Sequence, residues 1–405
     1  MSNQPVQLFS DTETAFAYKS DAELKKARFL FNMMGMPSLV KLATRFTPLA
    51  IEWNLPVRGL LRKTIFKQFV GGENLQEVSA VVDKLNDFNV QVIMDYGAEG
   101  KESEDDFEKV TLEFIKLLEF ASGKSNIPFI GIKITGFARF ALLEKLNDCI
   151  KFDPSIQVDT TVLSISELQE WQQVLLRLDR ICNKAAACKV GVLIDAEESW
   201  IQNTIDALAL QAMANYNQGF CAVYNTYQMY RHDRLSFLES NLAWAGTNKL
   251  ILGAKVVRGA YMEKERARAL AMNYESPIQV DKQSSDRDFD AAILLALQNL
   301  DHCSIIIASH NEESAAMATS VVEKQGVSIQ HPHIHFSQLY GMSDHLTFNL
   351  AKKGCNASKY LPYGPLEDVV PYLMRRAQEN SAVSGETGRE LQLINKEINR
   401  RLGKQ

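Results

Sequence analysis

The stretch KYLPYGPLEDVVPYLMRRAQEN, residues 359–380, contains a short apolar run followed by a longer segment without strand character. Pro365 suits the first position of a helix, because proline lacks the N–H that would be unsatisfied there. Glu367 and Asp368 suit the first turn, where carboxylates interact favourably with the helix dipole. The stretch therefore predicts a strand that leads directly into a helix beginning near Pro365.

The predicted helix carries two adjacent arginines about two and a half turns from its start. Arg375 and Glu379 are four residues apart and so share one face of the helix, and Arg376 lies beside Arg375. Two neighbouring guanidinium groups offer several fixed N–H donors to one planar carboxylate, which lysine cannot imitate. The pair thus predicts an anion clamp, and a solvated Arg/Glu surface face is the alternative.

The same strand-then-helix pattern recurs along the chain from about residue 90. Eight apolar runs are short enough for strands and rich in Val, Ile, Phe or Tyr, and amphipathic segments separate most of them. The runs are VQVIMDY (90–96), FIGIKIT (129–135), VGVLIDA (190–196), GFCAVYN (219–225), LILGAKVVRGAY (250–261), SIIIASH (304–310), HIHFSQL (333–339) and ASKYLPY (357–363).

Eight strands alternating with helices predict an α/β protein built on a (β/α)8 barrel, with a doubly wound open sheet as the competitor. Residues 1–89 show helical periodicity instead, so we expect an N-terminal helical arm over 1–89 and a catalytic barrel with C-terminal helices over 90–405. Neither GxGxxG nor GxxxxGK[ST] occurs, which argues against a Rossmann or P-loop nucleotide site.

The composition narrows the classes of function. The 405 residues carry a net charge of -5 with no long basic stripe, which argues against broad nucleic-acid binding. Six scattered cysteines without a CxxC pair indicate a reducing compartment. No signal core, Arg-rich leader or long apolar run is evident, so we expect a cytoplasmic protein. Peripheral contact with the inner face of the membrane is a further hypothesis.

In a barrel, the polar residues at the carboxyl ends of the strands converge on one mouth, where catalytic groups gather. Glu197 and Glu198 are adjacent, and neighbouring residues of an extended strand point to opposite faces, so a glycosidase-type pair is disfavoured. The residues read from these ends are Asp95, Lys133, Asp195, Glu197, Glu198, Asn225, Gln228, Lys255, Arg258, His310, Asn311, Gln338 and Tyr360.

The sequence also raises two other kinds of chemistry, a Schiff base and a metal site. Lys133 or Lys255 could form a Schiff base if burial lowered the pKa of its amine, and an ion pair closing the mouth is the plainer explanation. Three histidines alternate with other residues at positions 331, 333 and 335, which would place them on one face of a strand. Histidines grouped in this way could act as metal ligands. No HExxH motif or cysteine set supports them, so no metal site is expected.

Six motifs in a fixed order resemble the proline dehydrogenase family, and most closely its monofunctional, mitochondrial-like branch. The resemblance implies a distorted (β/α)8 barrel that holds FAD non-covalently and oxidises L-proline to Δ1-pyrroline-5-carboxylate. It also implies a quinone as electron acceptor, in the first step of proline catabolism. The motifs are LIDAEES (193–199), NTYQMY (225–230), KVVRGAYMEKERARA (255–269), ASHN (308–311), FSQLYGM (336–342) and YLPYGPLEDVVPYLMRRAQEN (360–380).

On the substrate side, the resemblance implies one carboxylate-binding group and the walls around the proline ring. The resemblance implies that Arg375 and Arg376 bind the carboxylate with help from Lys133. It implies that Asp195 supports this cationic group, that Tyr360 and Leu339 contact the ring, and that Tyr261 lies beside the flavin.

On the cofactor side, the resemblance implies contacts to the flavin ring, to the phosphate and adenosine portion, and one nearby carboxylate. The ring contacts are Asn225, Gln228, Lys255, Val257, Gly259 and Ala260, the phosphate and adenosine contacts are His310 and Asn311, and the carboxylate is Glu379. The bifunctional branch has arginine where Lys255 stands and tryptophan where Met262 stands. A Schiff-base lyase and a non-catalytic amino-acid sensor remain as alternative functions.

Overall fold

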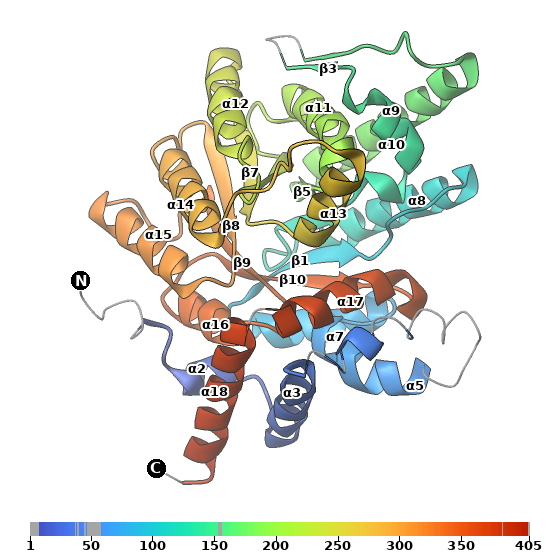
Figure 1. The fold of residues 1–405 in the computed structure, drawn as a ribbon. Helices are drawn as coiled ribbons and strands as arrows, with labels where there is room; N and C mark the ends of the chain where they lie inside the picture. The colour runs from blue at the N-terminus through green and yellow to red at the C-terminus, as the bar shows by residue number, and fades with distance from the viewer. Residues whose placement is uncertain are drawn as a thin grey trace. The chain divides into compact units, whose positions relative to one another are not determined.

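The computed structural model describes residues 8–36, 38, 40–43, 46, 58–152, 156–382 and 384–403. Eight strands form a closed barrel in the order β1-β10-β9-β8-β7-β6-β5-β2. This confirms the predicted (β/α)8 architecture and excludes the open sheet. Figure 1 traces the chain and labels most of the helices and strands. The strands are β1 (Gln91–Tyr96), β2 (Phe129–Ile132), β5 (Gly191–Ile194), β6 (Val223–Gln228), β7 (Leu252–Val257), β8 (Cys303–Ala308), β9 (Ile334–Leu339) and β10 (Ala357–Tyr363).

Each strand coincides with one of the eight predicted runs, and helices separate most of them. A two-stranded sheet of β3 (Ile150–Lys151) and β4 (Gln157–Val158) lies in the long connection after β2. The helices are α2 (Thr12–Phe16), α3 (Asp21–Met34), α5 (Arg58–Leu61), α6 (Lys67–Phe69), α7 (Leu75–Asn86), α8 (Glu104–Ala121), α9 (Phe140–Asn147), α10 (Ile165–Cys188), α11 (Ser199–Tyr216), α12 (Arg234–Asn248), α13 (Met262–Met272), α14 (Lys282–Leu297), α15 (Glu312–Lys324), α16 (Asp344–Lys352), α17 (Leu366–Ala382) and α18 (Ser384–Arg401), with a π-helical turn at Arg62–Phe66 and a 3₁₀ turn at Ile134–Gly136.

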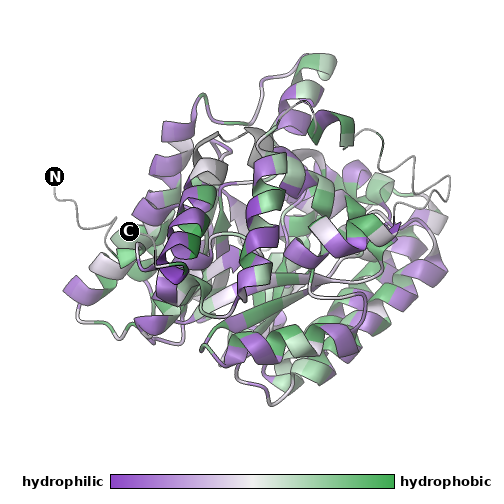
Figure 2. Ribbon diagram, turned by 90° about the horizontal axis from the view of Figure 1, so that it is seen from below, coloured by the Kyte–Doolittle hydropathy of each residue, from purple (hydrophilic) through white to green (hydrophobic). Residues whose placement is uncertain are grey.

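Local sequence explains where several helices begin. Ser164 caps α10, and Glu167 reaches back to the Ser164 backbone, so both residues satisfy N–H groups that the first turn leaves open. Ser20 and Glu23 form the same capping box at the start of α3. The strands β2 and β5 are buried along their whole length, as expected when helices cover a parallel sheet. Polar and apolar residues are interspersed along the helices (Figure 2).

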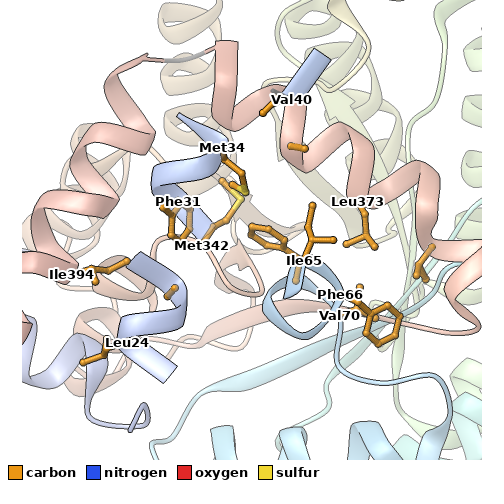
Figure 3. Packing of buried hydrophobic residues seen from close by; sticks show 14 of the residues in the cluster. Leu24, Phe31, Met34, Val40, Ile65, Phe66, Val70, Met342, Leu373 and Ile394 are labelled. Carbon is orange, nitrogen blue, oxygen red and sulfur yellow. The ribbon is translucent and has the colours of Figure 1, made fainter. Parts of the chain in front are cut away.

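The chain forms two compact units, residues 1–97 with 310–319 and 336–405, and residues 98–309 with 320–335. The N-terminal helices belong to the first unit, where Phe31, Met34 and Ile65 pack with Leu373 of α17 and Ile394 of α18 (Figure 3). Parts of the predicted arm, including residues 47–57, lie outside the described residues, and its separation from the barrel stays a prediction. No helix in the described part of the chain is long and apolar enough to cross a membrane.

A buried ionic cluster lies within the first unit. Asp344, at the start of α16, accepts a hydrogen bond from the Tyr18 hydroxyl at 2.8 Å and forms ion pairs with the ammonium groups of Lys19 and Lys359 at 2.9 Å each. Lys359 lies on β10, and its side chain and that of Asp344 are fully buried. Although burial acts to raise it, the two lysines hold the pKa of Asp344 well below its usual range. The cluster thus links the segment after α2 to a barrel strand.

Gly341 lies where the backbone of two distant segments meets. Its φ angle is +81°, and a Cβ atom there would lie 2.0 Å from the carbonyl oxygen of Gln68, which follows the π-helical turn. The Gln68 amide also donates to the Gly341 carbonyl at 2.8 Å. Only glycine combines this backbone conformation with so close an approach.

We expect Gly341→Ala to lower the free energy of unfolding by about 2–4 kcal/mol, because a left-handed conformation and a backbone clash both oppose the methyl group. Gly326→Ala is the matched control, since Gly326 has a φ of +67° and no atom within 4 Å of its would-be Cβ. It should cost about 1–2 kcal/mol. Urea unfolding followed by circular dichroism measures both, and equal losses would contradict the close approach at Gly341.

Candidate active site

A cluster of two lysines and one aspartate lies at the carboxyl-terminal side of three barrel strands. Lys133 follows β2, Asp195 follows β5, and Lys255 lies on β7. The Lys133 ammonium is 3.1 Å from Oδ2 of Asp195, and the Lys255 ammonium contacts Oδ1 of the same carboxylate. Lys255 is buried and only about an eighth of the Lys133 and Asp195 side chains is exposed. One carboxylate thus lies between two nearly buried positive charges, and Lys133 also interacts electrostatically with the buried carboxyl group of Glu197.

This lysine–aspartate cluster brings two cationic side chains to one carboxylate. Two buried ammonium groups repel each other unless a shared counter-charge offsets the repulsion, and Asp195 supplies it. The backbone fixes the carboxylate, because Asp195 N–H donates to the Ile132 carbonyl at 2.9 Å. Asp195 is therefore held where it contacts both lysines.

Glu197 is a candidate functional residue for which the sequence predicted no role. Its carboxylate accepts hydrogen bonds from the Thr135 hydroxyl at 2.5 Å and from the Thr135 N–H at 3.2 Å. Burial raises the pKa of Glu197 to about 7, although Thr135 and Lys133 act to lower it. Thr135 ends one predicted apolar run and Glu197 directly follows another, and this similar position was the signal in the sequence. A carboxyl group with such a pKa can exchange a proton near neutral pH.

The amides of β6 differ in what they can still bind. Asn225 donates to Asp206 at 2.8 Å and accepts from the Thr226 N–H at 2.9 Å. Gln228 donates to the Glu197 carbonyl at 3.2 Å, and its buried Oε1 has no hydrogen-bond partner among the described residues. Gln228 therefore offers an acceptor to a ligand, whereas Asn225 is largely held within the protein.

The segment after β7 presents backbone rather than side chains. Val257 ends the strand, and Gly259 and Ala260 are exposed. Gly259 has a φ of +132°, and a Cβ there would lie 2.5 Å from the Tyr230 ring, so this position requires glycine. Tyr261 follows as the N-cap of α13 and is buried. Glu265, on the next turn, accepts from the N–H and hydroxyl of Ser199 and ties α13 to the start of α11.

The other predicted ring and carboxylate contacts lie in the first unit. Tyr360 on β10 is buried and pairs in register with Leu339, the last residue of β9. Arg375, Arg376 and Glu379 lie on α17, as the sequence predicted. The buried Arg376 guanidinium contacts the Glu379 carboxylate and lies 4.9 Å from the centre of the Tyr372 ring.

His310 and Asn311 form the loop between β8 and α15. His310 Nδ1 is 2.9 Å from the Ser343 hydroxyl, and the Ser343 N–H donates to Glu390 at 3.0 Å. The Asn311 side chain accepts from the Ser314 N–H at 3.0 Å, in the manner of a helix cap. The three histidines near β9 do not form a metal centre: in the described part of the chain, no group of three or more His, Cys, Asp or Glu side chains could hold a metal ion.

The chain is similar to proteins of one family over most of its length. A family profile described as proline dehydrogenase matches residues 78–389. Proline dehydrogenase 1, mitochondrial, from Dictyostelium discoideum is 29% identical over 97% of this chain and 75% of that protein. A hydroxyproline dehydrogenase from Xenopus laevis is 31% identical over 96% of this chain and 89% of its own length. The carbapenem antibiotics biosynthesis protein CarD of Pectobacterium carotovorum is 31% identical over 85% and 86%.

Solved structures agree in fold. Proline utilization A from Bdellovibrio bacteriovorus, inactivated by N-propargylglycine, superposes with a TM-score of 0.77 at 17% identity, covering 98% of this chain. This chain spans only 43% of that larger protein. Because the profile covers well over half of the sequence and relatives at 31% identity match nearly end to end, the chain belongs to the proline dehydrogenase family.

Proposed function

We propose that this protein oxidises L-proline to Δ1-pyrroline-5-carboxylate with FAD as cofactor and passes the electrons to a quinone. The observation that carries the proposal is the lysine–aspartate cluster, which brings two nearly buried cationic side chains together in a chain that belongs to the proline dehydrogenase family. Such a group suits the carboxylate of an amino acid. When bound, FAD supplies a two-electron acceptor for the hydride that leaves the substrate carbon next to nitrogen.

The residues of the second unit fit a flavin. The isoalloxazine ring carries one N–H donor between two carbonyl oxygens, and Gln228 Oε1 is a buried acceptor without a partner among the described residues. Lys255 supplies a donor, and the exposed Gly259–Ala260 backbone admits a flat ring closely because it carries little side-chain bulk. Asn225, Val257, His310, Asn311 and Glu379 stay predictions as further cofactor contacts.

On the substrate side, the family resemblance assigns the proline carboxylate to Arg375 and Arg376, with Lys133 assisting. Arginine forks hold a carboxylate in a fixed orientation, which sets the position of the carbon that loses the hydride. The negative charge of Asp195 would offset part of the repulsion within this cationic group before the substrate binds. Tyr261 and Leu339 would border the ring.

An anaerobic titration of the purified, FAD-loaded protein with L-proline tests this function. We expect a yellow protein whose flavin absorbance is bleached by proline. Arg375→Met and Arg376→Met should each raise the proline concentration for half-bleaching by about 10- to 100-fold, because each removes a charged hydrogen bond to the substrate, while the flavin content stays close to that of the wild type. Arg180→Met, an exposed arginine paired with Glu108 on α8, is the matched control.

Three results would contradict the proposal. Bleaching that is unchanged in both arginine variants would contradict the binding of the substrate carboxylate by Arg375 and Arg376. Borohydride trapping of substrate on Lys133 or Lys255 would indicate a Schiff-base lyase instead. A colourless protein that still binds proline after FAD is offered would indicate a sensor.

The relatives include both proline and hydroxyproline dehydrogenases, and Tyr360 is the residue that we expect to separate these substrates. A bulky, buried ring at this position crowds a hydroxyl group on the substrate ring. We expect Tyr360→Ser to improve kcat/KM for hydroxyproline relative to proline by about 10-fold or more, because it opens space and adds a polar partner. Steady-state kinetics with both substrates measure this ratio, and Tyr216→Ser, at the end of α11, is the control. The same ratio in wild type and Tyr360→Ser would exclude Tyr360 as the determinant.

A further inference from the structure

We propose that the outer face of the N-terminal helices docks this protein on an anionic lipid surface. We define the basic-apolar face by its exposed apolar residues, Phe29, Met36, Leu42 and Leu60, and its exposed basic residues, Lys25, Lys26, Arg28, Lys63 and Lys67. The inference rests on the proposed function, because a quinone acceptor resides in a membrane and the reduced enzyme must reach it.

The charge of this region differs sharply from that of the chain. Residues 24–69 contain nine lysines and arginines and a single acidic residue, Glu52, whereas the whole chain has a net charge of -5. The remainder is therefore strongly acidic. A concentration of positive charge in one short region of an acidic protein gives an oriented attraction to a negatively charged surface.

The basic side chains of the face are available to an external partner. Lys25, Lys26, Arg28, Lys63 and Lys67 are exposed and make no ion pair with any residue that the structure describes. Nearby arginines differ, because Arg58 pairs with Glu367, and Arg62 with Glu73 and Glu77. These side chains are therefore accessible to the phosphate groups of lipids.

The apolar residues of the face are too exposed for ordinary surface helices. Phe29 is 64% exposed, Met36 52%, Leu42 56% and Leu60 66%. A surface helix normally buries its apolar side and presents polar residues to water. Here the inner side is already apolar and buried, since Phe31, Met34 and Ile65 pack in the cluster with α17 and α18 (Figure 3).

Phe29 lies on the side of α3 opposite the buried residues Leu24, Ala27 and Phe31, and Met36 follows two residues after the helix ends. Lys25 and Lys26 precede Phe29 by one turn, so charge and apolar surface alternate along one side. Large apolar side chains among lysines are typical of segments that lie in the lipid interface, where rings enter the acyl boundary and ammonium groups contact anionic headgroups. An acidic protein would satisfy the charges but not the separate apolar side chains.

Co-sedimentation of the full-length, FAD-loaded protein with lipid vesicles tests the proposal. Vesicles of phosphatidylcholine with about 30% phosphatidylglycerol should bind it at least about tenfold more tightly than pure phosphatidylcholine, and added salt should weaken binding. Lys25→Glu/Lys26→Glu should lose about tenfold or more in affinity for the anionic vesicles. Phe29→Gln/Leu60→Gln should lose a similar factor.

Matched controls change the same residue types elsewhere on the surface. Lys116→Glu/Lys324→Glu produces the same change in net charge, and Leu270→Gln/Val280→Gln removes side chains that are 86% and 88% exposed. Both should bind within about twofold of wild type. Losses in the controls equal to those in the face variants, or no preference for anionic vesicles, would overturn the proposal. A dimer that Phe29→Gln/Leu60→Gln converts to monomer would assign the face to a second copy instead.

Activity with a soluble dye as electron acceptor separates this inference from the proposed function. All face variants should oxidise proline with the dye at the wild-type rate. Proline oxidation without vesicle binding would contradict the docking surface but not the proposed function. Vesicle binding with the expected variant pattern, but without proline oxidation, would contradict the proposed function and still support the docking surface.

Discussion

The Asp195 carboxylate lies between the ammonium groups of Lys133 and Lys255, and the chemistry of the candidate site depends on this shared contact. Two nearly buried positive charges would repel each other and disfavour their own burial, and one fixed negative charge makes the arrangement tolerable. Lys133 also interacts with the buried Glu197, so the charge balance of the site involves both carboxyl groups. The barrel supplies the geometry, since β2, β5 and β7 bring residues 133, 195 and 255 to the same end.

Buried charge is used differently in the first unit. Asp344 there is surrounded by Lys19, Lys359 and the Tyr18 hydroxyl, and the cluster joins the N-terminal segment to β10. Removing one member of such a group leaves another charge buried and unpaired, which is why these clusters resist change. The N-terminal helices are thus attached by specific ionic contacts as well as by the apolar cluster. Their inner side serves the fold, and their outer side is open to a partner.

The sequence predicted the eight strands well because each is a short run rich in Val, Ile, Phe or Tyr, and amphipathic segments separate most of these runs. It also indicated that Lys133, Asp195 and Lys255 would meet, since parallel strands bring their carboxyl ends together. It did not indicate the Asn225–Asp206 bond, because Asp206 is a helix residue whose partner depends on how α11 packs on β6. The pairing of Thr135 with Glu197 depends on loop conformation after two strands, which residue patterns do not specify. Asp344 and Lys359 carried no recognisable pattern.

A double-mutant cycle on Asp195 and Lys255 tests the shared contact most directly, with the free energy of unfolding in urea as the measured quantity. Asp195→Asn should lower this free energy by about 3–5 kcal/mol, because it leaves two ammonium groups without their counter-charge. Adding Lys255→Met should restore part of the loss, since the repulsion then disappears. If the two substitutions instead destabilise the protein additively, Asp195 does not hold the cationic cluster together and the account is wrong.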